Sequence, residues 1–235
     1  MTSLLVMNLG RCDYDRAWDL QRQLHARLLA QPDGPAYLIL VEHPPVITLG
    51  RRADHAHVLL PREELARRGV LVREVDRGGD VTYHGPGQLV AYPIILLTGK
   101  RRDVHAYFRS LEQTVIDLLA DYTIPAGRKD GLTGVWVGDD KVCAMGVAIK
   151  RWATYHGLAL NVDPDLTHFQ FITPCGIVDK GVTSIARLLG RPVPLHEVAD
   201  KLITHFAAQF NFTEIRRDAI PPSIEPIASP LRPAS

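Results

Sequence analysis

The chain has few cysteines and almost no net charge. Its 235 residues include three cysteines, Cys12, Cys143 and Cys175, which are odd in number and far apart. This spacing argues against a disulfide framework and against a zinc site. The 27 basic and 26 acidic residues give a net charge of +1, which provides no general attraction to nucleic acid or to an anionic membrane. Charge-based recognition must therefore come from local patches.

The sequence also lacks long hydrophobic runs. The longest, 89–97, contains Tyr92 and Pro93 and is far shorter than the roughly 18 residues of a membrane span. Residues 1–10 show neither a basic segment nor a cleavage-site pattern, so we expect no signal peptide, no membrane association and a cytoplasmic protein. With 46% hydrophobic and 23% charged residues, the composition is that of a globular protein with a substantial core.

Mixed helical and strand-like patterns predict a single α/β (α+β) domain with a mixed, mostly antiparallel sheet flanked by helices. Helices are expected at 14–29, 61–68, 104–119 (with Asp103 as N-cap) and 194–210, and strands at 37–41, 46–49, 71–75, 89–96, 135–137, 142–149 and 154–162. The Gly-Asp-Asp sequence at 138–140 predicts a hairpin turn. We expect the folded domain to cover 1–220 and the proline-rich residues 221–235 to form a loosely ordered tail.

The segment Arg77–Gln88, RGGDVTYHGPGQ, is predicted to be a ligand-binding loop. It contains four glycines between two strand-like runs, together with Tyr83 and His84. Glycine allows positive φ angles and lets the backbone approach a ligand closely. No Gly-Lys-Ser/Thr ending follows, as it would in a phosphate-binding P-loop. We therefore interpret the segment as a ligand cradle other than a phosphate-binding P-loop.

Cys175 is the best candidate nucleophile. It lies in FITPCGI between Pro174 and Gly176, a loop context suited to presenting a thiol rather than to core packing. A thiol needs a nearby positive charge to become a thiolate at neutral pH, and Lys141 or His84 could supply it. Cys143 alternates within a predicted strand and Cys12 precedes a helix, so we interpret both as structural.

A second Tyr-His-Gly sequence ends at His156 and Gly157, in TYHGLALNV. Gly157 marks either a bulge or close backbone contact within a strand, or a contact with a flat apolar ligand such as an acyl chain. Lys141 opens the second strand of the predicted hairpin. Taken alone, it is better explained as a solvated lysine at a strand end than as a functional one.

Six segments, in this order, resemble the lipoyl(octanoyl) transferases of lipoate biosynthesis. They are HPPVITLGRR (43–52), RGGDVTYHGPGQLVAYP (77–93), GVWVGDDKVCAMG (134–146), HGLALNV (156–162), TPCGI (173–177) and VTSI (182–185). The resemblance covers about residues 43–188. It implies the fold of the biotin/lipoate protein ligase-like superfamily. It also implies an acyltransferase that moves an octanoyl group from octanoyl-acyl carrier protein to a lysine of a lipoyl domain.

The resemblance also implies roles for individual residues. Cys175 matches the nucleophile and Lys141 the lysine that activates it, and no ATP, metal or other cofactor is implied. The implied substrate-binding residues are Arg77, Gly78, Gly79, Asp80, Val81, Thr82, Tyr83 and His84, then Ala144, Met145 and Gly146, and then Gly157, Leu158 and Ala159. Backbone amides of the glycine-rich loop, Met145 and Gly146 are candidate oxyanion donors. We expect His84 to orient the loop or the acyl carbonyl.

The implied acceptors are the lipoyl domains of 2-oxoacid dehydrogenase acyltransferase subunits and the H protein of glycine cleavage. Acyl carrier proteins are acidic, so we expect a local basic docking patch, to which Arg51, Arg52, Lys150 and Arg151 could contribute. Three other functions compete with this interpretation. They are an ATP-dependent lipoate or biotin ligase, a cysteine hydrolase that releases the acyl group to water, and a non-catalytic acyl-binding module.

Overall fold

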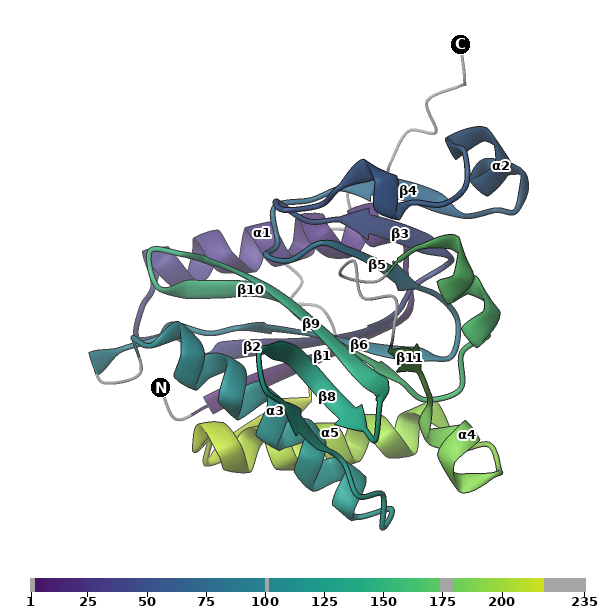
Figure 1. Ribbon diagram of the computed structural model, residues 1–235. Coiled ribbons are helices and arrows are strands. Elements are labelled where there is room, and N and C mark those ends of the chain that lie inside the picture. Colours follow the sequence, from purple (N-terminus) through teal and green to yellow (C-terminus); the bar gives the residue numbers. More distant parts are fainter. Residues whose placement is uncertain (1–2, 100–101, 174–179, 218–235) are drawn as a thin grey trace.

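Figure 1 shows the computed structural model, which describes residues 3–99, 102–173 and 180–217. Its strands are β1 (Ser3–Arg11), β2 (Ala36–Glu42), β3 (Val46–Leu49), β4 (Leu71–Glu74), β5 (Val81–His84), β6 (Gln88–Ile94), β7 (Gly127–Lys129), β8 (Leu132–Val137), β9 (Asp140–Lys150), β10 (Ala153–Asn161), β11 (Gly181–Val182) and β12 (Glu214–Arg217). Its α-helices are α1 (Tyr14–Ala30), α2 (Arg62–Arg67), α3 (Val104–Ala120), α4 (Ile185–Leu189) and α5 (Leu195–Phe210), and short 3₁₀ helices lie at His55–His57 and Leu166–Phe171.

The centre of the fold is a mixed sheet with the strand order β12-β1-β2-β6-β10-β9-β8-β7, and β11 adds to β9. Strand β1 is parallel to both β12 and β2, and β11 is parallel to β9. The other pairs described in this sheet are antiparallel. The prediction of a mixed, mostly antiparallel sheet is confirmed, and the Gly-Asp-Asp sequence does connect a hairpin, β8–β9.

Helices cover both faces of this sheet (Figure 1). Helix α1 lies on one face and buries Ala17, Leu20, Leu24 and Leu28, the residues that the 3.6-residue periodicity placed together. They share a hydrophobic cluster with residues of β2, β6 and β10. Helices α3 and α5 lie side by side on the opposite face and form the largest hydrophobic cluster with the sheet.

Helix α3 begins where its cap predicts. The Asp103 carboxylate accepts a hydrogen bond from the backbone N–H of Ala106 at 3.0 Å, which satisfies one of the free donors of the first turn. Two residues expected on the apolar face are less buried than the periodicity suggests, because Val104 is 39% exposed and Phe108 is only half-buried. Both lie at the N-terminal end of α3 and border the cavity described below.

The glycine-rich segment is not one continuous loop, which corrects the prediction. Strand β5 occupies its middle and pairs antiparallel with β3, and β3 pairs in parallel with β4. These strands form a separate three-stranded sheet. A four-residue turn, 77–80, precedes β5, and a second turn, 85–87, leads into β6. Residues 81–84 extend because Val81 and Tyr83 alternate into a small core with Ile47.

Strands β1, β7, β11 and β12 were not predicted. Strand β12 has four exposed residues, so no hydrophobic alternation marks it, and it forms by pairing with β1. Strand β11 has only two residues. The proposed boundary at 220/221 and the proline-rich tail lie outside the described residues. Within the described ranges, we find no helix with the length and apolar character needed to span a bilayer.

Candidate active site

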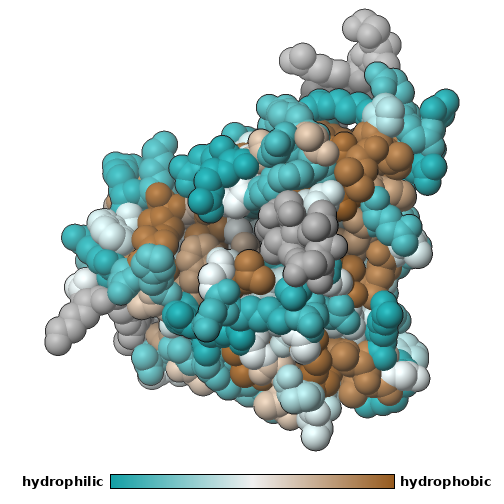
Figure 2. Space-filling model, viewed as in Figure 1, coloured by the Kyte–Doolittle hydropathy of each residue, from teal (hydrophilic) through white to brown (hydrophobic). Residues whose placement is uncertain are grey.

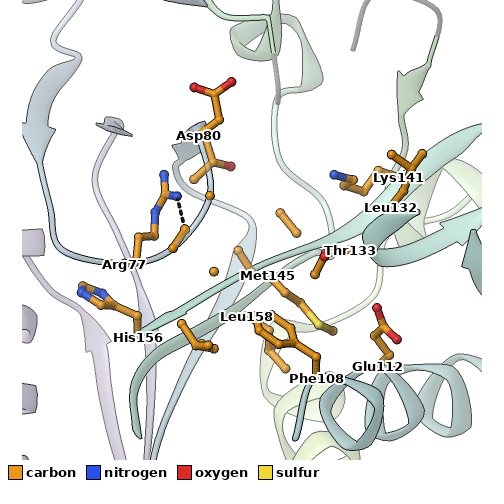
Figure 3. A pocket seen from close by; sticks show the side chains of 18 of the residues that line it. Arg77, Asp80, Phe108, Glu112, Leu132, Thr133, Lys141, Met145, His156 and Leu158 are labelled. Carbon is orange, nitrogen blue, oxygen red and sulfur yellow. Dashed lines mark hydrogen bonds between the residues drawn. The ribbon is translucent and has the colours of Figure 1, made fainter. Parts of the chain in front are cut away.

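A cavity of about 1100 Å³ lies between the two sheets, and predicted site residues line it. They are Lys141 and every implied substrate-binding residue except Tyr83. Figure 3 shows how Arg77, Met145, Leu158 and Lys141 face this space from different elements. On the face of the molecule shown in Figure 2, hydrophobic residues are visible in a recess bordered by hydrophilic ones. The fold therefore brings together the three segments that the resemblance implied.

The turn 77–80 is held in place by the buried side chain of Arg77. Its Nη2 donates to the carbonyl oxygen of Thr48 at 2.7 Å and to Thr48 Oγ1 at 2.9 Å, and its Nη1 donates to the carbonyl oxygen of Gly78 at 3.0 Å. Backbone bonds from Gly50, Arg51 and Arg52 to the turn add to this support. Arg77 is thus a structural clamp for the loop as well as a lining residue.

The opposite wall is formed by β9 and β10, where two glycines face each other in register, Gly146 and Gly157. A Cβ at Gly157 would overlap the carbonyl oxygen of Ala91 on β6. The close contact that Gly157 permits is therefore with the neighbouring strand, although the residue also lines the cavity. Gly146 instead lies against the turn 77–80. A hydrogen bond of 2.8 Å from the Gly78 N–H to the carbonyl oxygen of Val147, the residue after Gly146, holds the turn there.

Lys141 reaches the cavity because β9 is irregular at this point. Val135 pairs with Cys143 and Trp136 pairs with Lys141, so β9 contributes one extra residue, Val142. A β-bulge of this kind breaks the alternation of side chains between the two faces. Lys141 lines the cavity, whereas Val142 and Cys143 both join the core. Lys141 is only 9% exposed, which excludes the interpretation of a solvated strand-end lysine.

Cys175 lies outside the described residues, so the structure does not place it. The other two cysteines are free thiols and buried. Burial raises the pKa of the Cys143 thiol far above its usual range and also raises the pKa of Cys12. Both remain protonated at neutral pH. Their burial confirms the interpretation that they are structural.

His84 is buried at the cavity wall and held by a side-chain network. Its Nδ1–H donates to Gln88 Oε1 at 2.7 Å, Gln88 Nε2 donates to Asn161 Oδ1 at 2.9 Å, and Asn161 Nδ2 donates to the carbonyl oxygen of Thr183 at 3.0 Å. Burial, with the nearby His43 as a second cause, lowers the pKa of His84 to about 3. His84 is therefore neutral and cannot supply the positive charge that a thiolate requires, which leaves Lys141 of the two candidates.

His43 supports one end of the same cavity. Its Nδ1–H donates to the carbonyl oxygen of Cys12 at 2.7 Å, so its Nε2 accepts from the Tyr92 hydroxyl at 2.8 Å. Burial lowers the pKa of His43 to about 4. Tyr14 stacks on His84 with ring centroids 6.1 Å apart, and Tyr14 and Tyr92 both line the cavity. This end of the cavity is aromatic with polar groups at its margins.

His156 adds a further buried imidazole to the lining. Its Nε2–H donates to Asp76 Oδ1 at 2.9 Å, and the Tyr155 hydroxyl donates to the other oxygen of Asp76. The hydrogen bond from His156 is the main cause that lowers the pKa of Asp76 to about 2. The backbone of His156 has φ of 55°, and its N–H donates to Gln21 Oε1 at 2.8 Å. The second Tyr-His-Gly sequence thus supplies a fixed side chain to the cavity.

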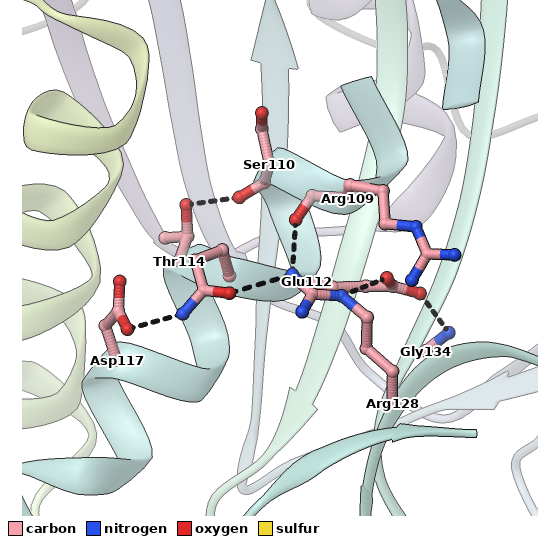
Figure 4. Close-up of polar contacts among 8 residues, drawn as sticks. Arg109, Ser110, Glu112, Thr114, Asp117, Arg128 and Gly134 are labelled. Atoms are coloured by element: carbon pink, nitrogen blue, oxygen red, sulfur yellow. Dashed lines mark hydrogen bonds and ion pairs between the residues drawn. The ribbon is translucent and has the colours of Figure 1, made fainter. Parts of the chain in front are cut away.

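Sequence reasoning missed the side of the cavity formed by α3 and the β7–β8 hairpin (Figure 4). Glu112 is buried and accepts hydrogen bonds from Arg128 Nε at 2.9 Å and from the backbone N–H of Gly134 at 3.2 Å. Arg128 also donates to the carbonyl oxygen of Arg109 at 2.9 Å. Phe108 faces Met145 and Leu158 here (Figure 3). The one sequence signal for this side of the cavity was Glu112, a glutamate within the buried face of an amphipathic helix.

Tyr83, one of the implied substrate-binding residues, does not line the cavity. The Tyr83 ring packs against Phe169 in the small sheet, and its hydroxyl contacts His168 Nδ1 at 2.7 Å.

Of the four residues of the predicted docking patch, Arg51 and Arg52 line the cavity, whereas Lys150 and Arg151 do not. Within the described ranges, no group of three or more His, Cys, Asp or Glu residues could hold a metal ion.

Comparison with known proteins agrees with this geometry. Residues 13–207 match the family described as the lipoyl protein ligase A/B catalytic domain. The chain is similar to an octanoyltransferase of Chloroflexus aggregans, with 51% identity over 218 residues that make up 92% of this chain and 98% of the relative.

Two solved structures share the fold. The Thermoplasma acidophilum protein Ta0514, described as a putative lipoate protein ligase with bound lipoic acid, has a TM-score of 0.76 and 18% identity over 94% of this chain and 91% of its own. A lipoate-protein ligase A bound with ATP has a TM-score of 0.77 and 18% identity over 94% of this chain and 90% of its own. The chain belongs to the lipoyl protein ligase A/B catalytic-domain family and, within it, to the octanoyltransferases, which are acyltransferases.

Proposed function

We propose that this octanoyltransferase takes its acyl group from the thioester of octanoyl-acyl carrier protein and passes it through a Cys175 thioester to a lysine of a lipoyl domain. The acceptors are the lipoyl domains of 2-oxoacid dehydrogenase acyltransferase subunits and the H protein of glycine cleavage. The observation that carries the proposal is the single cavity that joins Lys141 to the three acyl-binding segments. The reaction uses neither ATP nor a metal.

The described residues on either side of the segment that contains Cys175 lie near Asp140 and Lys141. Cys175 follows Thr173 by two residues, so their Cα atoms are at most about 7 Å apart. Thr173 and Lys180, which flank the undescribed segment, line one smaller pocket together with Asp140, the neighbour of Lys141. After Lys180 the chain pairs directly with Lys141 through Val182.

Lys141 acts as the proton carrier in both halves of the reaction. The Cys175 thiolate attacks the donor thioester carbonyl, and the C–S bond to the carrier arm breaks as the Lys141 ammonium gives its proton to the departing thiolate. In the second half, the acceptor lysine amine attacks the Cys175 thioester. Lys141, now an amine, removes the proton of that nitrogen, and Cys175 leaves as a thiolate. The enzyme ends in its starting state.

Each tetrahedral intermediate needs donors for its oxyanion, and the strand register favours one of them. The Val147 carbonyl points away from β10, because it accepts from Gly78. Backbone groups alternate in direction along an antiparallel strand, so the Met145 N–H points to the same edge and the Gly146 N–H points toward β10. We therefore assign Met145, rather than Gly146, as the backbone oxyanion donor of this strand.

Two of the competing functions differ from this proposal in what they consume or release. An ATP-dependent ligase is favoured by the fold, which is shared with a lipoate-protein ligase bound with ATP. That chemistry passes through an acyl-adenylate and has no need of a cysteine nucleophile. A cysteine hydrolase would use the same Cys175 and Lys141 but release free octanoate.

A transfer assay distinguishes the three activities. The protein is incubated with a lipoyl domain and either octanoyl-acyl carrier protein without ATP, or octanoate with ATP and magnesium. The masses of the domain and the released acid are then followed. We expect octanoylation of the domain with the carrier thioester alone. Modification only with octanoate and ATP would establish a ligase, and release of octanoate without modification would establish a hydrolase.

A further inference from the structure

Three of the six lysines of this chain, Lys129, Lys141 and Lys180, gather around Asp139 and Trp136. Two of them share one carboxylate, because Asp139 Oδ1 contacts Lys129 Nζ at 2.5 Å and Lys180 Nζ at 3.0 Å. These two ammonium groups hold the pKa of Asp139 down at about 2. The Asp139 carboxylate is therefore ionised and forms ion pairs with Lys129 and Lys180.

Lys141 depends more closely on Trp136, although Lys129 Nζ also lies over that ring, 5.8 Å from its centroid. The Lys141 Nζ lies 4.7 Å from the centroid of the Trp136 ring, within the range of a cation–π interaction. Among residues 3–99, 102–173 and 180–217, no ion pair joins Lys141 to a carboxylate. A buried ammonium is costly unless it is compensated, and the indole face of Trp136 supplies part of that compensation.

The structure holds Lys141 and Trp136 in fixed positions. The bulge at Val142 makes Trp136 the cross-strand partner of Lys141. Gly134 lies beside the lysine methylene groups, because a Cβ there would be in van der Waals contact with Lys141 Cε at 3.5 Å, and its lack of a side chain permits the close approach of the Cys143 carbonyl oxygen, 2.6 Å from that Cβ. Glu112 in turn accepts from the Gly134 N–H at 3.2 Å (Figure 4).

We propose that Trp136 is a positioning residue of the acyl-transfer site, whose indole face holds the Lys141 ammonium at the cavity. This inference rests on the proposed function for its catalytic consequence. Trp136 is 3% exposed, and its indole N–H has no hydrogen-bond partner among the described residues. The position therefore uses the aromatic ring and not the N–H, so phenylalanine should replace tryptophan there.

The first test follows the rate at which octanoyl-acyl carrier protein acylates the enzyme in a single turnover. Replacing the aromatic ring in Trp136→Leu should lower the maximal acylation rate about tenfold and leave the apparent affinity for the donor unchanged. Trp136→Phe should stay within about threefold of the wild type, because phenylalanine retains a π face. Trp152→Leu is the matched control, since Trp152 lies under Arg102 at 5.9 Å but does not line the cavity.

The second test does not depend on turnover. Six lysines are few enough to resolve by NMR after labelling of the ε-CH₂ group, and Lys141→Ala assigns the signal. Ring currents of Trp136 should shift the Lys141 signal upfield in the wild type. The shift should persist in Trp136→Phe and vanish in Trp136→Leu.

The outcomes separate this inference from the proposed function. An unshifted Lys141 signal in the wild type, or a Trp136→Leu variant that acylates at the normal rate, would overturn the role of Trp136 while leaving the transfer mechanism intact. An equal loss in Trp136→Phe and Trp136→Leu would show a merely structural role. If the wild type forms no acyl-enzyme at all, the proposed function fails, and the catalytic role of Trp136 fails with it.

Discussion

Gly146 lies directly against Arg77 across the cavity wall. A Cβ at Gly146 would be 3.0 Å from Arg77 Cδ and 3.0 Å from the carbonyl oxygen of Gly78. The turn 77–80 and strand β9 therefore meet at a position where even one methyl group must displace the turn. The contact makes the width of the acyl cavity depend on the absence of a side chain at Gly146.

Gly146→Ala should impair acyl binding more than folding. The added methyl group pushes on Arg77 and Gly78, and we expect a loss of about tenfold in apparent affinity for the octanoyl donor, equivalent to about 1–2 kcal/mol of overpacking. The apparent affinity is read from the donor dependence of single-turnover acylation. Unchanged affinity would show that the turn does not border the bound acyl chain.

Gly157→Ala should destabilise the whole sheet. Its Cβ would overlap the Ala91 carbonyl of β6, a backbone atom that cannot move without disturbing the strand, so we expect a loss of about 3 kcal/mol in the free energy of unfolding. Urea denaturation measures this. Gly127→Ala is the control, because nothing lies within 4 Å of the Cβ it would add. A similar stability in the two variants would contradict the packing described for Gly157.

The sequence predicted the parts of the fold that follow from local periodicity. Helix α1 and the Asp103 cap were found because regular apolar spacing and a capping residue act over a few neighbours. Strand β12 formed without any such pattern, because its pairing with β1 is a contact between distant parts of the chain. Short exposed edge strands depend on that tertiary contact.

The sequence predicted which residues line the candidate site better than it predicted the backbone geometry that places them there. Resemblance supplied Lys141 and the three lining segments, but nothing in KVCAMG indicates a bulge at Val142 or a tryptophan beneath the lysine. Glu112 and Phe108 were hidden within a helical pattern that reads as core. They line the cavity because α3 lies against the β7–β8 hairpin, where Glu112 bonds to Arg128 and Gly134, and this contact joins distant parts of the chain.

Acid should destabilise the protein through its buried neutral histidines. The pKa is lowered to about 4 at His43 and about 3 at His84, whereas an unfolded histidine titrates near 6.5, at about the usual value. The unfolded state therefore binds more protons, so stability is retained above about pH 6.5 and falls as the pH decreases toward these values. Two such groups give a slope of about 2.7 kcal/mol per pH unit near pH 5.

His84→Gln isolates one of these groups. Glutamine does not titrate, so the dependence of unfolding free energy on pH should lose about half of the histidine slope, about 1.4 kcal/mol per pH unit. Urea unfolding of both proteins between pH 6 and pH 4.5 measures the difference. Parallel curves would mean that His84 is not buried in its neutral form.

Docking of the carrier protein should depend on Arg51 and Arg52, which are exposed and line the cavity. Reversing both charges with Arg51→Glu and Arg52→Glu should lower kcat/KM for the donor by about tenfold at low salt and weaken its salt dependence. Lys150 and Arg151, the other two predicted contributors, lie at the exposed β9–β10 turn and do not line the cavity, so Lys150→Glu with Arg151→Glu should have a smaller effect and serves as the comparison. Equal effects of the two double variants would indicate a general charge effect instead of a docking site.

The most direct test of the central claim is the intact mass of the enzyme after mixing with octanoyl-acyl carrier protein in the absence of ATP. We expect a gain of one octanoyl group that maps to Cys175, is absent in Cys175→Ser, persists in Cys12→Ser and Cys143→Ser, and disappears when a lipoyl domain is added. In Lys141→Ala the adduct should form about a hundredfold more slowly, the lower end of typical general acid–base contributions. Transfer to the lipoyl domain without any adduct on Cys175 would contradict the covalent mechanism.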